Sequence, residues 1–404
     1  MLRVTILVLG AALLAGGCGA ARTPETPRAP FTPKLVASGP APRVVYRAPG
    51  SPGTAGFHRY EYVLPDRAID VYEAERPFRL VERIDVPESH SLRGVAMSPR
   101  TGILYASVGG NGGDSGNGGV LAYDLRTNRV IWQRAFPTGT DGLAVTPDGS
   151  TLFVPEGERS FDDVWWVVDA RTGRVTHEIH AAPGPHNTIV SADGRLVYLG
   201  PRNSRFLVVA STRTDRVVKK VGPLKGGVRP FTVDPARSLA YTTATGFLGF
   251  QVSSLRTGRL LYTVPIRFPW RRSLGTPSHG ISLTPNGKRL AVIDVPNSIV
   301  HVFDVARVPA RPPRLLANVK LDHSMSGKEQ PCGGDCGRAG WLQNGLDGRY
   351  LWVGDDGDVI STATDRVVGF APALAGSRYL LEIDWRGDRP VATSTRSGFA
   401  RDGR

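Results

Sequence analysis

The chain has 404 residues and a formal net charge of +14, with 48 glycines and 32 prolines. This composition suits short strands joined by tight turns and argues against a protein built from long helices. The positive charge would attract an anionic partner. No dense block of Lys and Arg appears, however, so the sequence does not favour nucleic-acid binding.

The first residues have the layout of a secretory signal. Met1–Arg3 supplies a positive charge, Val4–Ala15 is a short apolar run, and a small-residue site then ends in Cys18. The apolar run is shorter than a membrane-spanning helix needs. Residues 1–18 resemble a bacterial lipoprotein signal, which implies lipidation of Cys18, a membrane anchor and an extracytoplasmic place in the cell envelope. A plain secretory signal that contains a cysteine is the alternative.

The next segment, residues 19–56, is rich in Pro, Ala, Thr and Gly and lacks the alternation of apolar and polar residues that marks a strand. We expect a stiff, extended tether outside the folded core. The folded domain is expected over 57–397, followed by a short carboxyl-terminal tail over 398–404.

A four-residue phrase recurs through the folded region at near-constant spacing. Its copies are Arg126-Thr-Asn-Arg129, Arg171-Thr-Gly-Arg174, Arg213-Thr-Asp-Arg216 and Arg256-Thr-Gly-Arg259, at steps of 45, 42 and 43 residues. Alternating apolar residues flank each copy. A period in the low forties, made of short strands and tight turns, is typical of β-propeller blades.

Six segments share one pattern, in which an inner strand is followed by a tight turn and a second strand. The inner strands are predicted at Gly94–Ser98, Gly142–Thr146, Asn187–Ser191, Pro230–Asp234, Gly280–Thr284 and Trp341–Gly345. A seventh blade is predicted from both chain ends, with its first two strands at Leu380–Asp384 and Pro390–Thr393 and its outer two at Ala68–Tyr72 and Phe78–Ile84. Such closure leaves no open sheet edge in the ring. We therefore predict an all-β, seven-bladed propeller.

Turns such as Pro147-Asp148-Gly149, together with Asp124 and Asp169 before the Arg-Thr turns, resemble the extracytoplasmic YVTN-type repeat family of lactonase-like propellers. The resemblance covers about Tyr60 to Arg396. The literal Tyr-Val-Thr-Asn string is absent, and Leu239–Thr243 is its nearest relative. The resemblance implies the fold and an extracytoplasmic setting, while function has to be argued from the site.

The long loops gather on the face where the inner strands begin. Counting back from the turns gives seven entry positions near the channel mouth: Arg93, Asp141, His186, Arg229, His279, Gly340 and Tyr379. Arg93 and Arg229 suit an anion site that clamps a carboxylate or phosphate. His186, His279 and Asp141 suit a metal site. A polar, water-filled channel without a ligand is the third interpretation.

Two further features lie in loops of the same face. Trp270, Arg271 and Arg272 are of the types that dominate partner contacts. Cys332 and Cys336 are expected to form a local disulfide in an oxidising compartment, with a metal cluster that includes His323 as the alternative.

Two function classes follow. The first is a monomeric, membrane-tethered binding protein or scaffold whose partner is an anionic ligand, a protein, a glycan or another polyanion. The second is an enzyme, a lactonase-like hydrolase or a metal-dependent oxidoreductase, with its site at the channel mouth. No nucleophile elbow, phosphate loop or dinucleotide fingerprint is present in the sequence. No catalytic constellation is complete in the sequence, so the binding class is favoured; the cofactor is unknown, with a metal at the channel mouth as one possibility.

Overall fold

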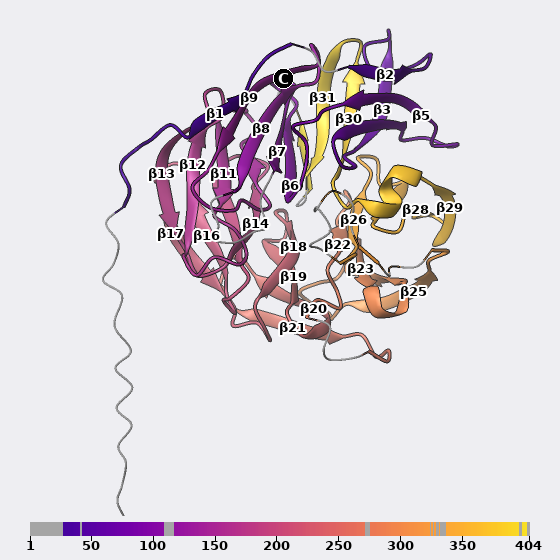
Figure 1. The fold of residues 1–404 in the computed structure, drawn as a ribbon. Helices are drawn as coiled ribbons and strands as arrows, with labels where there is room; N and C mark the ends of the chain where they lie inside the picture. Colours follow the sequence, from indigo (N-terminus) through magenta and orange to yellow (C-terminus); the bar gives the residue numbers. More distant parts are fainter. Residues whose placement is uncertain are drawn as a thin grey trace, which may run out of the picture.

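The computed structural model describes residues 27–40, 43–108, 117–270, 275–323, 325, 327–328, 331, 337–395 and 398–401. In these residues the protein is a ring of seven antiparallel sheets, which confirms the predicted seven-bladed β-propeller (Figure 1). The helical segments described are two short 3-10 helices, η1 (Val295–Asn297) and η2 (Pro372–Gly376). In the part of the chain that the structure describes, no helix is long and apolar enough to cross a membrane.

The first three blades each have four main strands that pair in chain order. Blade 1 comprises β6 (Gly94–Ser98), β7 (Ile103–Val108), β8 (Gly119–Asp124) and β9 (Arg129–Ala135). Blade 2 comprises β10 (Ala144–Val145), β11 (Thr151–Pro155), β12 (Val164–Asp169) and β13 (Arg174–His180). Blade 3 comprises β14 (Pro185–Val190), β15 (Leu196–Pro201), β16 (Leu207–Ser211) and β17 (Arg216–Val221).

The next three blades repeat this order. Blade 4 comprises β18 (Val228–Asp234), β19 (Leu239–Ala244), β20 (Phe247–Ser254) and β21 (Leu260–Pro265). Blade 5 comprises β22 (Ile281–Leu283), β23 (Arg289–Asp294), β24 (Ile299–Asp304) and β25 (Arg314–Lys320). Blade 6 comprises β26 (Trp341–Asn344), β27 (Tyr350–Gly354), β28 (Asp358–Ser361) and β29 (Arg366–Phe370). The predicted inner strands therefore lie where the sequence placed them, to within a few residues.

The repeated phrase forms the turn between the third and fourth strands of a blade. Its third residue adopts a left-handed backbone in every copy, at φ 52° for Asn128, 71° for Gly173, 52° for Asp215 and 75° for Gly258. Gly, Asn and Asp tolerate this conformation best, which explains the residue types at that position. Blade 6 carries a fifth copy that sequence inspection missed, in which Ala363 replaces the first Arg and Asp365 has φ 54° before Arg366.

The core lies between neighbouring blades, because each sheet presents both faces to other sheets. Between blades 1 and 2, for example, Tyr105, Trp132, Phe136 and Trp166 are buried in one cluster, and the rings of Phe136 and Trp166 lie 5.0 Å apart. Burial on both faces explains why the second and third strands read as nearly continuous apolar runs.

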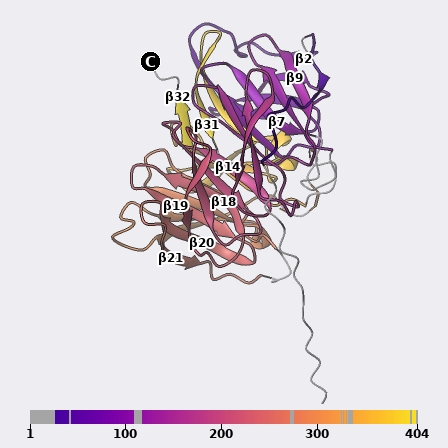
Figure 2. The ribbon, with the colours of Figure 1, turned by 90° about the vertical axis from the view of Figure 1, so that its left-hand side faces the viewer.

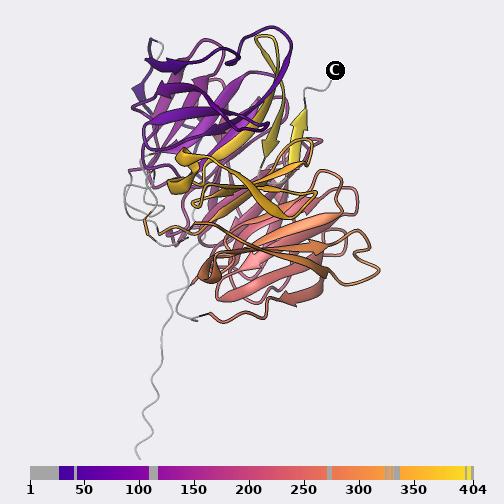
Figure 3. The same ribbon diagram turned by 90° about the vertical axis from the view of Figure 1, so that its right-hand side faces the viewer.

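The seventh sheet joins both ends of the chain, as predicted. Its order is β2-β5-β4-β3-β30-β31-β32. The amino end supplies β3 (Phe57–Val63), β4 (Ala68–Glu73) and β5 (Leu80–Asp85), and the carboxyl end supplies β30 (Leu380–Arg386), β31 (Arg389–Thr395) and β32 (Gly398–Arg401). Figure 2 shows β32 beside β31, and Figure 3 shows the ring from the opposite side.

The predicted roles of these strands need one correction. The strand next to β30 on the outer side is β3, and not Pro390–Thr393, which lies in β31 on the inner side. β3 pairs with β30 over seven consecutive residues, from Phe57 opposite Arg386 to Val63 opposite Leu380. Tyr60 and Tyr62 in this uninterrupted ladder are buried. Because β3 occupies the outer side of β30, β31 pairs with the inner side of β30 and lies near β6.

Two segments expected outside the core also take part in sheets. β1 (Lys34–Ala37) pairs with β9, and β2 (Val44–Arg47) pairs with β5, so part of the expected tether lies against outer blade edges. In the expected tail, Gly398–Arg401 forms β32 and pairs with β31. Outer strands offer unpaired backbone groups, which explains how a segment without clear strand patterning can pair there.

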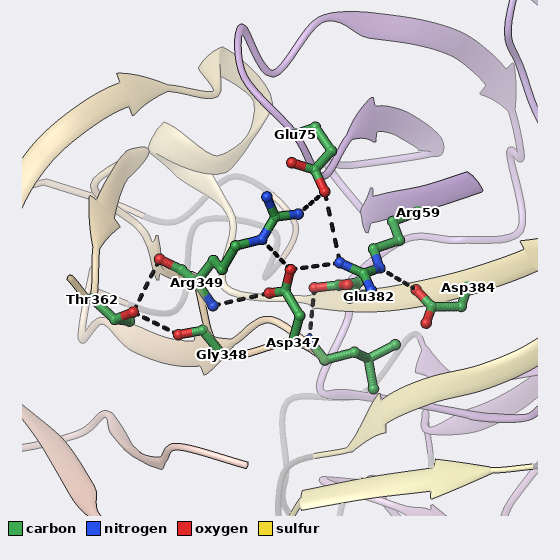
Figure 4. Close-up of polar contacts among 9 residues, drawn as sticks. Arg59, Glu75, Asp347, Gly348, Arg349, Thr362, Glu382 and Asp384 are labelled. Carbon is green, nitrogen blue, oxygen red and sulfur yellow. Dashed lines mark hydrogen bonds and ion pairs between the residues drawn. The ribbon is translucent and has the colours of Figure 1, made fainter. Parts of the chain in front are cut away.

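Ion pairs tie the closing blade to blade 6 (Figure 4). Nη1 of Arg59, in β3, lies 2.5 Å from a carboxylate oxygen of Asp347 in the β26–β27 turn, and its guanidinium is also 3.6 Å from both Glu75 and Asp384. Arg349 contacts Asp347 and Glu75 as well. Residues from the amino end, the carboxyl end and blade 6 thus meet in one charged network.

Candidate functional site

The entry positions of the inner strands converge at one end of the channel. Six of the seven predicted positions line a cavity of about 320 Å³, the exception being Gly340. The cavity is lined by Arg93, Asp141, Glu158, Arg159, His186, Arg202, Arg229, Gly275, Thr276, His279, Gly337, Ala339, Arg378 and Tyr379. Gly340 contributes through its backbone, since its carbonyl oxygen lies 3.2 Å from Nδ1 of His279. Residues distant in sequence therefore form one pocket.

Glu158, which sequence inspection missed, lies at the centre of the arginines. Its Oε1 is 3.2 Å from Nη2 of Arg93, and its Oε2 is 3.1 Å from Nη1 of Arg229 and 2.9 Å from Nη1 of Arg202. Nε2 of His186 lies 3.5 Å from the same Oε2. One carboxylate thus holds three guanidiniums from three different blades.

Asp141 positions both the entry strand and the loop that carries Glu158. Its Oδ1 accepts a hydrogen bond from the backbone N–H of Gly142 at 2.9 Å, and its Oδ2 accepts one from the N–H of Glu158 at 3.3 Å. Nη2 of Arg93 lies 3.8 Å from Oδ2. The Asp141 carboxylate is therefore engaged mainly in holding the loop.

Protonation states follow from burial and from the arginines. Burial raises the pKa of Glu158, but the neighbouring His186 and the three guanidiniums outweigh it and hold the pKa well below its usual value. Burial and the same arginines lower the pKa of His186 to about 3, despite the attraction of Glu158. Burial, Arg378 and Arg229 also hold the pKa of His279 well below its usual value. Near neutral pH the carboxylate is charged and both imidazoles are neutral.

The cavity carries an excess of positive charge. Five arginines and two carboxylates line it, so its net charge is three positive when both histidines are neutral. Burial lowers the pKa of Arg229 to about 10, which still leaves this guanidinium charged near pH 7. Arg159 is exposed and makes no hydrogen bond or ion pair with the described residues. The lining can therefore provide guanidinium N–H donors and a net positive charge to a bound anion.

The cavity also contains a set of metal-ligand types, although a different set from the one predicted. Ligand atoms of Asp141, Glu158 and His186 lie within 4.8 Å of one another. His279 is outside this group, with its ring 6.2 Å from that of His186 and edge-on to it. A cation here would have to compete with the guanidiniums that already hold Glu158, so the geometry suits an anion better than a metal ion.

The other predicted contact residues lie elsewhere or outside the described residues. Trp270 is half-buried and packs against the core cluster of blades 4 and 5 rather than the cavity. Arg271, Arg272, Cys18, Cys332 and Cys336 lie outside the described residues, so their contact, lipidation and disulfide roles stay predictions.

Three charged residues that sequence inspection missed lie in the same kind of loop, the one that follows the second strand of a blade. Glu158 and Arg159 follow the second strand of blade 2, and Arg202 follows the second strand of blade 3. Loops after second strands lie on the same face as the entry loops. The loops after the second strands, taken together with the entry loops, contain all three residues. Arg378 was also not predicted, although it directly precedes the predicted entry position Tyr379.

Comparison with known proteins supports the fold. No protein-family model matches the chain, and no curated protein matches it in sequence. Among solved structures, a Kuenenia stuttgartiensis hydrazine synthase is similar over 78% of this chain and 96% of its own, at 17% identity and a TM-score of 0.53. The dihydro-heme d1 dehydrogenase NirN in complex with DHE is similar over 84% of this chain and 70% of its own, at 15% identity and a TM-score of 0.55. At these identities the likeness shows the propeller fold alone.

Proposed function

We propose that this protein is a binding protein that holds a small, multiply charged anion at the mouth of its propeller channel. The observation that carries the proposal is the net charge of the cavity, in which five arginines outnumber two carboxylates. Buried guanidiniums fixed by Glu158 form a rigid floor, while Arg159 at the rim makes no ion pair with the described residues. A preorganised set of cations binds an anion without a large ordering cost.

The ligand class follows from the donors. Guanidiniums bind carboxylates and phosphates through paired N–H groups. Three net positive charges suit a ligand with two or three such groups. Because the neighbouring dehydrogenase is named for a dihydro-heme, a tetrapyrrole with carboxylate side chains belongs in the same screen as tricarboxylates and phosphate esters.

Binding rather than catalysis is favoured by the state of the titratable groups. A general base near neutral pH needs a pKa close to the working pH. Those of Glu158 and His186 are both held far below it. The charged Glu158 and the neutral His186 thus have positioning roles, and the cavity contains no activated nucleophile among the residues described.

The test is a binding screen with charge-matched variants. Citrate, pyrophosphate, sulfate and a carboxylated tetrapyrrole are titrated into the protein by calorimetry at two salt concentrations. We expect Arg159→Gln and Arg378→Gln each to lower the affinity for the tightest-binding ligand by about tenfold or more, because each variant loses a charge-assisted hydrogen bond. Arg213→Gln, an exposed arginine in a turn on the opposite face, should leave the affinity unchanged. The proposal fails if no anion binds, or if all three variants behave alike.

Anchoring to a membrane through Cys18 is a further part of the proposal, supported by the signal-like pattern of residues 1–18. An anchored receptor would keep its pocket at the cell surface. Expression in a bacterium with Cys18→Ala should move the protein from the membrane fraction to the soluble fraction. An unchanged distribution would contradict the lipid anchor without bearing on the anion pocket.

A further inference from the structure

A second group of ionisable side chains lies in blade 6, away from the arginine cavity. Asp355 and Asp356 lie in the turn between β27 and β28, and Asp358 is the first residue of β28; each is at most 1% exposed. The long entry loop, residues 321–340, is fastened to this turn at both ends. The backbone N–H of Asp322 donates to Oδ2 of Asp358 at 2.7 Å, and the N–H of Gly340 donates to Oδ2 of Asp355 at 3.0 Å.

The side chains of Asp356 and Asp358 are both buried. Neither makes an ion pair with a lysine or arginine among the described residues. Oδ1 of Asp356 accepts a hydrogen bond from the N–H of Asp358 at 3.1 Å, while its buried Oδ2 has no hydrogen-bond partner. Buried charges are costly unless they are paired or coordinate a metal. A buried oxygen without a hydrogen-bond partner can be satisfied by a water molecule or an ion, and a cation would also stabilise the neighbouring carboxyl groups.

His323 completes the group from the entry loop. Its Nδ1 lies 2.9 Å from Oδ1 of Asp358, and its ring stacks on Phe370 with centroids 4.3 Å apart, which fixes its orientation. Ligand atoms of His323, Asp356 and Asp358 all lie within 4.8 Å of one another. The His323 side chain is 45% exposed, which gives an ion a route from solvent.

We propose that His323, Asp356 and Asp358 bind one divalent first-row transition ion, with zinc as the first candidate. One imidazole nitrogen with carboxylate oxygens is the donor set of such ions, whereas calcium and magnesium prefer oxygen ligands alone. The ion would coordinate the unpartnered Oδ2 of Asp356 and neutralise both buried carboxyl groups in their ionised form. It would also fasten the entry loop to blade 6, at the rim where Gly337 and Ala339 line the arginine cavity.

The experiment is metal binding by the full chain after chelator treatment and dialysis. Zinc is titrated by calorimetry, metal content is measured after dialysis, and cobalt is added to record its visible absorption. We expect one zinc per chain, and a loss of affinity of at least about 10- to 100-fold in His323→Ala and Asp356→Asn, since the loss of even an outer-shell partner of a metal site costs this much. Cobalt bands should appear for the wild type and be absent in His323→Ala.

Matched variants separate this site from other sources of zinc binding. His180→Ala removes an outer-strand histidine that also faces carboxylates, with Nδ1 2.8 Å from Asp163, and should leave zinc binding unchanged. The double variant Cys332→Ser, Cys336→Ser and the variant His186→Ala should leave it unchanged as well. Unfolding curves without metal check that each variant is folded, and Asp356→Asn keeps the side-chain shape for that purpose. The proposal is overturned if zinc still binds with wild-type affinity to His323→Ala and Asp356→Asn. It is also overturned if zinc binding is lost in the cysteine double variant or in His186→Ala, or if the protein prefers calcium or magnesium.

Discussion

Removing the Glu158 carboxylate is the sharpest test of the arginine cavity. In Glu158→Ala three guanidiniums, each within 3.2 Å of the carboxylate, lose their counterion. The Glu158 side chain is 15% exposed, so water compensates little. Breaking a buried ion pair by deleting one partner costs about 3–5 kcal/mol in the free energy of unfolding. We expect a loss of that size.

The deletion also leaves a space shaped for a small carboxylate. Formate added to Glu158→Ala should therefore restore part of the lost stability, whereas chloride at the same ionic strength should restore less. The assay is thermal and denaturant unfolding of wild type and variant in formate and in chloride. Glu73→Ala is the control, since Glu73 pairs with Arg79 on the surface at 2.7 Å and should cost about 1 kcal/mol or less, with no formate effect.

Two results would refute this reasoning. A loss below about 1 kcal/mol would mean that Glu158 does not hold the arginines together, since that is the scale of an exposed ion pair. Equal rescue by chloride would mean that the arginines respond to ionic strength alone and offer no shaped carboxylate site.

Three further outcomes are expected. Burial and Asp384 raise the pKa of Glu382 from 4.5 to about 8. The free energy of unfolding should therefore be highest below pH 4.5 and fall as the pH rises toward 8. In denaturant unfolding across pH, Glu382→Gln should flatten this profile and add on the order of 4 kcal/mol at pH 8. A Cβ at Gly227 would lie 1.7 Å from the carbonyl oxygen of Arg202. Gly227→Ala should therefore lower the free energy of unfolding by about 1–3 kcal/mol and weaken anion binding measured by calorimetry. Gly275→Ala, with open space at its Cβ, should stay within about 0.5 kcal/mol of the wild type. Arg59→Met breaks the ion pairs that close the ring and should cost about 1 kcal/mol, a difference that should shrink in 1 M salt; a loss independent of salt would point to packing instead.

The sequence was sufficient for the fold because the repeat is local. Each turn phrase needs a left-handed third residue, which Asn128, Gly173, Asp215 and Gly258 supply, and each tight turn fixes the strand pairing beside it. Once the blades were counted, ring geometry alone brought entry positions such as Arg93, His186 and Arg229 together. The sequence therefore predicted six of the fourteen residues that line the cavity.

The closing blade was harder to assign from sequence. Which strand lies beside β30 depends on pairing between chain ends more than 300 residues apart, and several segments have similar apolar content. The seven-residue ladder between β3 and β30 is visible only after the ring has closed. Likewise, the pairing of β1 and β2 with outer strands depends on edges that exist only in the assembled propeller.

By itself, the sequence determined the period of the blades, the turn chemistry and the entry positions of the inner strands, because these depend on neighbours a few positions away. Only the tertiary structure placed Glu158 among Arg93, Arg202 and Arg229, made both cavity histidines neutral, and brought His323 to Asp356 and Asp358. Those properties arise from burial and from charges carried by distant segments, and Coulomb interactions in a buried pocket depend on distances in space that no local pattern of residues records.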